Sequence, residues 1–168
     1  RRAWRIFENS DTQREIMIYL LIAGSLLALD LGIKWYVENH FTEADIRRAA
    51  GGRILLRKSY NSGMAMNLLE NKPGFVKWLT AGLGLFLLVY ELCLLAKGGR
   101  TVEKTGWALV LGGACSNLYD RFRRKYVVDY FSFRCRWKKI QNIVFNLGDL
   151  FIFTGSILVV FAQIFRKK

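Results

Sequence analysis

Residues Ile16 to Val37 read IMIYLLIAGSLLALDLGIKWYV, and the length of this apolar stretch decides the fold class. An α-helix rises about 1.5 Å per residue, and the hydrocarbon core of a bilayer is about 30 Å thick. Because the stretch has 22 residues, a helix of this length crosses a bilayer. The sequence therefore predicts a transmembrane helix over about residues 16–37.

Three further apolar blocks follow along the chain. The block Phe75–Ala96 reads FVKWLTAGLGLFLLVYELCLLA and is also long enough to span a bilayer. The block from Thr105 to Tyr119 is short, but it becomes long enough when residues 101–104 supply its interfacial end. The last block runs from Phe145 to Phe165. We therefore expect three more transmembrane helices, at about residues 75–96, 101–120 and 145–165.

The four blocks predict an all-α membrane protein with one integral membrane domain over residues 1–168. A soluble protein with four buried helices is disfavoured, because so small a domain could not cover helices that are apolar on all sides. A cleavable signal peptide is also disfavoured, because the first block is longer than a signal-peptide core and no small-residue cleavage site follows it. Two loops, 38–74 and 121–144, then lie together on the side opposite the termini.

The basic residues bear on orientation and on partners. Ten Lys and Arg residues lie on the side of the termini and fourteen in the two opposite loops, but the ten occupy much shorter segments. The positive-inside rule weights charges in short loops near span ends, so we expect cytoplasmic termini. The net charge of +13 suits membrane lipid with anionic headgroups. A nucleic-acid partner is disfavoured, because the basic residues flank spans and do not form one face with interleaved aromatics.

The cysteines and the histidine exclude several kinds of site. Cys93, Cys115 and Cys135 provide no disulfide framework, and the spacings typical of zinc ligands are absent. His40 is the only histidine, which leaves little support for a Ser-His or Cys-His nucleophile. We therefore expect no metal and no cofactor, and any chemistry must come mainly from carboxylates, amides and basic groups.

Ionisable residues inside the predicted spans are unfavourable in a bilayer and are therefore candidate functional residues. Asp30 and Lys34 lie four apart, so they share a helix face and can pair. A neutralised pair that fixes helix packing is at least as good an interpretation as a catalytic role. Lys77 and Glu91 lie towards the two ends of the second span, where we expect their side chains to reach the interface.

Polar residues also gather at the end of the third span and the start of the fourth. The third span ends in GGACSNLYDRF, which puts Asn117, Asp120 and Arg121 on one helical face. The fourth opens with FNLGD, in which Asn146 and Asp149 are three apart. These two ends lie on the same face of the membrane, and Asp129, in VVDYF, comes from the loop between them. Carboxylates and amides are thereby brought to one depth.

Two interpretations of these carboxylates remain open. Asp149 taken alone is typical of a helix N-terminus stabilised by the macrodipole, and Asp120 beside Arg121 is typical of a solvated ion pair. If two carboxylates converge in a partly dehydrated place, they share a proton and titrate as a pair. Such a pair can activate water with one member while the other protonates a carbonyl oxygen or a leaving amine, without a metal.

The first outer loop contains GGRILLRKSYNSGMAMNLL. The Gly51-Gly52 turn, the apolar run from Ile54 to Leu56 and the turn-like Asn61-Ser62-Gly63 indicate a short hairpin or extended ribbon. Gly63 tolerates positive φ, and the Asn61 amide can hold an extended peptide or a carboxylate. An ordinary turn remains an equal alternative.

In order, the segments DLGIK, NSGMAM, GGACSNLYDR, VVDYF and FNLGD resemble lipoprotein signal peptidase, also called signal peptidase II. The resemblance covers nearly the whole chain and implies a four-helix aspartyl protease of the bacterial inner membrane with an outer β-cradle. It implies an active site near the extracytoplasmic face. The substrate it implies is a diacylglyceryl-modified prolipoprotein, which is cut just before the lipidated cysteine. We expect the protein to be a monomer.

The resemblance also implies roles for single residues. Asp129 and Asp149 form the catalytic dyad. Eight further residues support the site or bind substrate: Asn61, Gly63, Asn117, Asp120, Arg121, Asn146, Asp30 and Lys34. Among them, Asp120 is a structural carboxylate, and Asp30 and Lys34 are the polar pair of the first helix.

Four positions depart from the family pattern. The family usually has Gly at Ser116, Ala at Gly148, a bulky aromatic at Met66 and Gln at Leu31. These departures touch packing around the site, so they leave open a catalytically weakened relative that binds lipoproteins without cleaving them. A further alternative is a small transporter or scaffold that uses the intramembrane carboxylates for protons.

Overall fold

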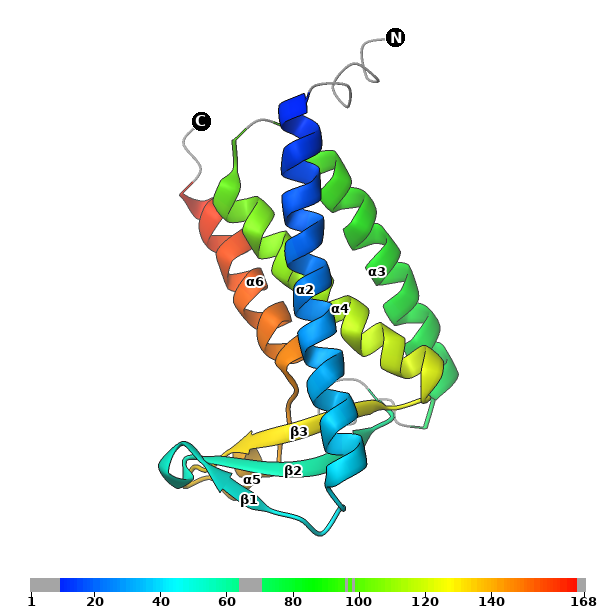
Figure 1. The fold of residues 1–168 in the computed structure, drawn as a ribbon, viewed down its shortest axis with the longest axis vertical. Helices are drawn as coiled ribbons and strands as arrows, with labels where there is room; N and C mark the ends of the chain where they lie inside the picture. Colours follow the sequence, from blue (N-terminus) through cyan, green and yellow to red (C-terminus); the bar gives the residue numbers. More distant parts are fainter. Residues whose placement is uncertain (1–9, 64–70, 96, 98, 166–168) are drawn as a thin grey trace.

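The structure, a computed structural model, describes residues 10–63, 71–95, 97 and 99–165. Four long helices form a bundle, and a small sheet lies across one end of it (Figure 1). The helices of the bundle are α2 (Ser10–His40), α3 (Pro73–Leu95), α4 (Thr101–Arg123) and α6 (Leu147–Ile164). One departure from the family pattern, Met66, lies outside the described residues.

In the described part of the chain, three helices are long and apolar enough to cross a membrane: Ser10–His40, Gly74–Leu95 and Leu147–Ile164. The fourth predicted span is also a helix, α4, but its composition does not qualify within the described part of the chain. The reason is visible in its packing, because α4 carries charged and amide side chains that are buried between the other helices, namely Glu103, Lys104, Asn117 and Asp120. The prediction of a mostly helical membrane protein is confirmed, and three of its four spans have the expected composition.

Glycines on α4 and α6 allow these two helices to pack closely. A Cβ atom on Gly106 would lie 2.8 Å from the carbonyl oxygen of Gly155. Two turns further along α4, a Cβ atom on Gly113 would overlap the carbonyl oxygen of Gly148. Small residues let backbones of neighbouring helices approach within a membrane, so this glycine seam sets the spacing of α4 and α6.

The sheet has three antiparallel strands in the order β1-β2-β3, with bounds Arg47–Ala49, Ile54–Asn61 and Val127–Phe133. The hairpin predicted in the first outer loop corresponds to β1 and β2, joined through a short 3-10 turn at Ala50–Gly52. The segment VVDYF, expected within a loop, instead belongs to strand β3, which pairs with β2. Strand pairing with a partner so distant in sequence is not visible in the local pattern.

An apolar cluster joins the sheet to the helices. It contains buried side chains from the last turn of α2, from the residue that follows α2 and from β3: Val37, Phe41, Val128, Tyr130 and Phe131. Leu147 and Leu150, at the start of α6, pack against it. The short helix α5 (Lys138–Gln141) follows β3, and the chain then returns to the sheet, where Phe145 bridges Phe131 before α6 begins. The sheet is therefore anchored where α2 ends and α6 starts.

Candidate active site

Asp129 lies on β3 and its side chain is almost fully buried, with 3% of its surface exposed. Two amide side chains donate hydrogen bonds to its carboxylate. Asn61 Nδ2, from the end of β2, lies 3.2 Å from Oδ2, and Asn146 Nδ2 lies 2.7 Å from Oδ1. Each oxygen atom of this buried carboxyl therefore has a donor.

Asp149 lies in the first turn of α6, where it closes a capping box with Asn146. The Asp149 N–H donates to Asn146 Oδ1 at 2.9 Å, and the Asn146 N–H donates to Asp149 Oδ2 at 3.1 Å. The other carboxylate oxygen, Oδ1, accepts from Asn117 Nδ2 of α4 at 2.9 Å. Capping thus fixes the helix start, and one oxygen of Asp149 is still directed towards α4.

Asn146 connects the two aspartates. Its side-chain nitrogen donates to Asp129, while its side-chain oxygen accepts from the backbone of Asp149. Because Asn146 is the residue before α6, the same amide fixes the helix start and the position of Asp129 on the sheet. The structure therefore brings both aspartates to one place through a single side chain.

The protonation of Asp129 follows from its surroundings. Burial, and next the negative charge of Asp149, raise the pKa of Asp129 to about 7. The hydrogen bonds from Asn146 and Asn61 act in the opposite direction and are outweighed. Near neutral pH a proton therefore remains available on this carboxyl, as the acid of a carboxylate pair requires.

Lys34 organises the polar side chains behind the aspartates. It is fully buried, as are Asp30 and Asp120. Its ammonium nitrogen contacts Asp30 Oδ2 at 2.9 Å, Asp120 Oδ2 at 3.1 Å, Ser116 Oγ at 3.1 Å and Asn117 Oδ1 at 2.8 Å. By accepting from Lys34 with its oxygen, Asn117 is oriented to donate its nitrogen to Asp149. The predicted Asp30–Lys34 pair therefore exists, and it joins α2 to α4.

Asp120 and Arg121 do not form the solvated ion pair that remained open from the sequence. Asp120 is buried and contacts Arg124 at 2.7 Å and the backbone N–H of Val128 at 3.2 Å. Arg121 instead reaches the Gly63 carbonyl oxygen with Nη2 at 2.9 Å. Asp120 thereby ties the end of α4 to the start of β3, and Arg121 binds the segment that leaves β2.

Gly63 and Asn61 lie at the end of β2, beside the two aspartates. The Gly63 N–H donates to Asn61 Oδ1 at 3.1 Å, which leaves the Asn61 nitrogen free to donate to Asp129. The turn-like sequence predicted here is therefore a hydrogen-bonded turn that aims one amide at a carboxylate.

A cavity of about 600 Å³ lies in front of the two aspartates. Its polar lining consists of Asn61, Asn117, Arg121, Asp129, Asp149 and Ser156. Its apolar lining comes from β3, the segment before α6 and α6 itself: Val127, Phe133, Ile143, Val144, Phe145, Leu150, Ile152 and Phe153. Volumes of this size and a few convergent polar groups are typical of ligand sites. Among the residues described, no group of three His, Cys, Asp or Glu side chains could hold a metal ion.

Two hydroxyl groups near the aspartates were not predicted from the sequence. The Tyr130 hydroxyl donates to Asp30 Oδ1 at 2.7 Å and accepts from the Leu147 N–H at 2.8 Å. Ser116 Oγ donates to Asp30 Oδ2 at 2.5 Å. A buried tyrosine needs a partner for its hydroxyl, but this signal was missing for Tyr130, because VVDYF was expected within a loop. Burial, and next the negative charge of Asp30, raise the pKa of Tyr130.

The structure also accounts for two departures from the family pattern. Ser116 adds a hydroxyl that bridges Asp30 and Lys34, so it extends the buried network. Gly148 lies in the glycine seam, where a Cβ atom would be 2.9 Å from Asn146 Oδ1 and 3.0 Å from Asp30 Oδ2. The close packing in this chain therefore requires glycine at position 148.

Comparisons with known proteins support the resemblance. Residues 4–165 match the family described as signal peptidase (SPase) II. A lipoprotein signal peptidase of Serratia marcescens is 30% identical over 149 residues, covering 89% of this chain and 86% of the relative. A lipoprotein signal peptidase of Clostridioides difficile is 31% identical over 154 residues, covering 90% of this chain and 99% of the relative.

A solved structure of a bacterial membrane enzyme shares the fold, with a TM-score of 0.76 at 19% identity, and the match covers 91% of this chain and 94% of that one. The family match spans almost the whole sequence, and the relatives are matched over most of their length. The resemblance identified from the five segments is thereby confirmed: the chain belongs to the signal peptidase II family.

Proposed function

We propose that this protein is a membrane aspartyl endopeptidase that removes the signal peptide from diacylglyceryl-modified prolipoproteins by cleaving before the lipidated cysteine. The observation that carries the proposal is the pair Asp129 and Asp149, joined by Asn146 at the polar end of an otherwise apolar cavity. The names of the relatives, lipoprotein signal peptidases, support the choice of substrate.

The contacts of the two aspartates suggest different roles. Asp129, whose pKa lies at about 7, starts the reaction protonated and donates its proton to the scissile carbonyl oxygen. Asp149 accepts a proton from the attacking water, whose oxygen bonds to the carbonyl carbon. In the second half, Asp149 returns its proton to the leaving amine nitrogen as the C–N bond breaks. Asp129 recovers its proton from the tetrahedral intermediate.

The residues around the pair would hold an extended peptide. Arg121 already binds the carbonyl oxygen of Gly63, and Asn61 accepts from the Gly63 N–H and donates to Asp129. The apolar lining from α6 and from residues 143–145 would contact the acyl chains and the apolar signal segment. Phe153 on α6 is largely exposed, so the cavity borders a helix face that would lie against lipid.

In the membrane, α4 would be the fourth span. Its 23 residues correspond to about 34 Å of helix, which is enough to cross the hydrocarbon core. Three of its charged residues, Glu103, Lys104 and Asp120, are buried against neighbouring helices and would not face lipid, as expected of intramembrane charges. We place the helix ends near Ser10 and Ile164 at the cytoplasmic side of the inner membrane and the sheet at the extracytoplasmic side, with the protein acting as a monomer.

The test is cleavage of a diacylated prolipoprotein by the purified protein in a bilayer, with product masses measured. The expected result is one cut, directly before the lipidated cysteine. The matched control is the same prolipoprotein without the diacylglyceryl group, which we expect to be cut at least tenfold more slowly. No cleavage of the diacylated substrate would contradict the proposal and would favour a non-cleaving binder.

A further inference from the structure

Three arginines at one end of the sheet have exposed guanidinium groups. Arg53 precedes β2 and Arg134 follows β3, and the Arg134 N–H donates to the Arg53 carbonyl oxygen at 2.8 Å. Arg136 follows two residues later. All three side chains are exposed, and within the ranges that the structure describes none of them takes part in an ion pair. We call this group the arginine end of the sheet.

The acidic residues of the same layer lie elsewhere. Asp45 lies in the connection between α2 and β1, at the opposite end of the sheet (Figure 1), and accepts from the Thr42 N–H at 2.7 Å. Glu38, at the end of α2, accepts from the hydroxyls of Tyr60 at 2.9 Å and Tyr126 at 3.4 Å. Within the described residues, no carboxylate therefore forms an ion pair with the arginine end to neutralise its positive charge.

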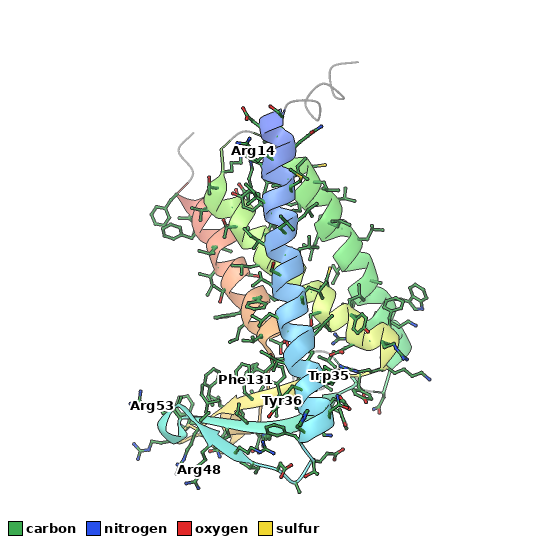
Figure 2. All side chains as sticks on the ribbon, in the orientation of Figure 1. Arg14, Trp35, Tyr36, Arg48, Arg53 and Phe131 are labelled. Carbon is green, nitrogen blue, oxygen red and sulfur yellow. The ribbon has the colours of Figure 1, made fainter. Side chains whose placement is uncertain are left out.

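The position of the sheet puts this end at the membrane surface. The strands run across the end of the bundle, and the tip with Arg53 extends past the start of α6 (Figure 2). Trp35 and Tyr36, both exposed, lie on α2 at the level of the sheet (Figure 2). Exposed Trp and Tyr side chains mark the headgroup level of membrane proteins. The arginine end therefore lies beside the bundle at the depth of lipid headgroups.

Apolar side chains accompany the arginines. Trp137, next to Arg136, is 72% exposed, and Phe133, next to Arg134, is 42% exposed. Alternation of basic and large apolar residues is typical of segments that lie in a membrane interface, where the rings enter the acyl boundary and the cations meet phosphates. An acidic peptide in water would be attracted by the arginines but would leave these rings exposed to water, so lipid fits both features.

We propose that the arginine end of the sheet binds the phosphate groups of anionic phospholipids in the leaflet that surrounds this end of the bundle. The inference rests on the membrane placement given under the proposed function. Phe133 also lines the cavity, so the bound headgroups lie beside the entrance that a lipid-modified substrate would use. Anionic lipid thereby anchors the projecting end of the sheet next to the site.

The test uses the full chain in bilayers of phosphatidylcholine with a quarter phosphatidylglycerol. Bromine, which quenches tryptophan fluorescence on contact, is placed on one lipid or on the other, so the overall composition stays the same. The chain has five tryptophans, and the difference between the unmodified protein and Trp137→Phe isolates the Trp137 signal. Each arginine near a charged surface contributes about a fivefold preference, so we expect at least fivefold stronger quenching per mole by phosphatidylglycerol.

Three variants, each compared with its own Trp137→Phe counterpart, decide whether the arginines cause the preference. Arg53→Gln with Arg134→Gln should lower it severalfold and leave only what Arg136 contributes, whereas Arg53→Lys with Arg134→Lys should keep it. The matched control, Arg123→Gln with Lys125→Gln, removes the same charge at the end of α4 and should leave the preference unchanged. Equal quenching by the two lipids, or a preference that the first pair of substitutions leaves unchanged, overturns the inference. A change in Trp137 fluorescence with polyglutamate but not with anionic lipid also overturns the inference.

This readout does not depend on cleavage. A protein that shows the lipid preference but cuts no prolipoprotein would contradict only the proposed function. A protein that cleaves normally without the preference would contradict only the present inference. The two failures are therefore distinguishable.

Discussion

Asn146 explains how an aspartate can stand at the entrance to an apolar helix. Its side chain accepts from the Asp149 N–H and donates to Asp129. One amide therefore provides a partner both for a backbone N–H in the first turn of α6 and for one carboxyl oxygen of Asp129. Asn117 satisfies a further oxygen of Asp149. Buried carboxyl groups persist when their oxygens have donors, and here the donors are neutral amides, which leave the pair free to exchange a proton.

The first prediction concerns the pH dependence of cleavage. Asp129 has a pKa of about 7, so it carries the proton required of the acid below this pH and loses it above. We therefore expect kcat to fall about tenfold per pH unit above pH 7. Single-turnover cleavage of a diacylated prolipoprotein between pH 5 and pH 9 measures this. A rate that rises steadily through pH 8 and 9 would rule out Asp129 as the acid.

The second prediction concerns Tyr130, which connects the strand of Asp129 to the helix of Asp149. Its hydroxyl joins Asp30 to the Leu147 N–H, two residues before Asp149. In Tyr130→Phe the two aspartates lose this link, so kcat should fall about tenfold while KM stays within about twofold. The matched control is Tyr126→Phe, whose hydroxyl contacts Glu38 outside the cavity. An equal loss of kcat in both variants would indicate a merely structural effect.

Some site residues can be predicted from the sequence and others cannot. Asn146 and Asp149 are three apart at a helix start, and alternation of membrane sides places Asp120 near them, so spacing alone was informative. The roles of Tyr130 and Ser116 depend on Asp30, which is 100 and 86 residues away in the chain. Local patterns contain no information about such contacts. The contact of Asp120 with Arg124, by contrast, is an i,i+4 pair at the end of α4, which local spacing does offer.

At the scale of elements, the glycine seam between α4 and α6 determines where Asp149 lies. Gly113 packs against the backbone of Gly148, directly before Asp149, and Gly106 packs against Gly155 two turns further along α6. Asn117, which donates to Asp149, lies one turn after Gly113 on α4. The separation of the two helices therefore sets the distance between the donor and the carboxylate.

The third prediction follows from this seam. In Gly113→Ala the new methyl group would meet the Gly148 carbonyl oxygen, so α4 and α6 must separate. Overpacking of this kind costs about 1–3 kcal/mol, and we expect a lower unfolding temperature together with reduced kcat. The matched control is Gly82→Ala on α3, where nothing lies within 4 Å of the new atom. Thermal unfolding in one detergent compares them, and equal stability of the two variants would contradict the seam.

Two elements differ from the sequence predictions for reasons of tertiary structure. The strand β3 forms because Ser59, Tyr60 and Asn61 of β2 offer it a pairing edge, which no pattern within VVDYF indicates. Glu91, expected to reach the interface, is instead 1% exposed within α3, and its carboxylate has no hydrogen-bond donor within the described ranges. The position near the end of a span was a weak guide, because the packing of neighbouring helices decides burial.

At the scale of the whole molecule, α4 is the central helix and carries polar residues at both ends. Near the sheet it contributes Asn117 and Asp120 to the network of Lys34. At the other end Lys104 pairs with Glu15 of α2, and Glu103 accepts from Gln163 of α6 at 2.7 Å. Polar contacts between helices at both ends fix α4 against its neighbours. They also explain why the composition of α4 is more polar than that of the three helices that could cross a membrane.

The fourth prediction tests this arrangement in the membrane. A membrane-impermeant maleimide added to intact cells should label a cysteine introduced at Arg136, beside the sheet. It should not label one introduced at Thr101, at the opposite end of α4, until the membrane is opened. The natural cysteines Cys93, Cys115 and Cys135 are replaced by serine beforehand. Labelling of both positions from outside would contradict α4 as a span.

The measurement that tests the account most directly is cleavage of a diacylated prolipoprotein by Asp129→Asn and by Asp149→Asn in the same bilayer. Because each aspartate is assigned one proton transfer, each variant should lose about 10²- to 10⁴-fold in rate while keeping its fold, as judged by thermal unfolding. The matched control, Asp45→Asn, alters a carboxylate far from the cavity and should cleave at the normal rate. Cleavage at the normal rate by either dyad variant would contradict the account.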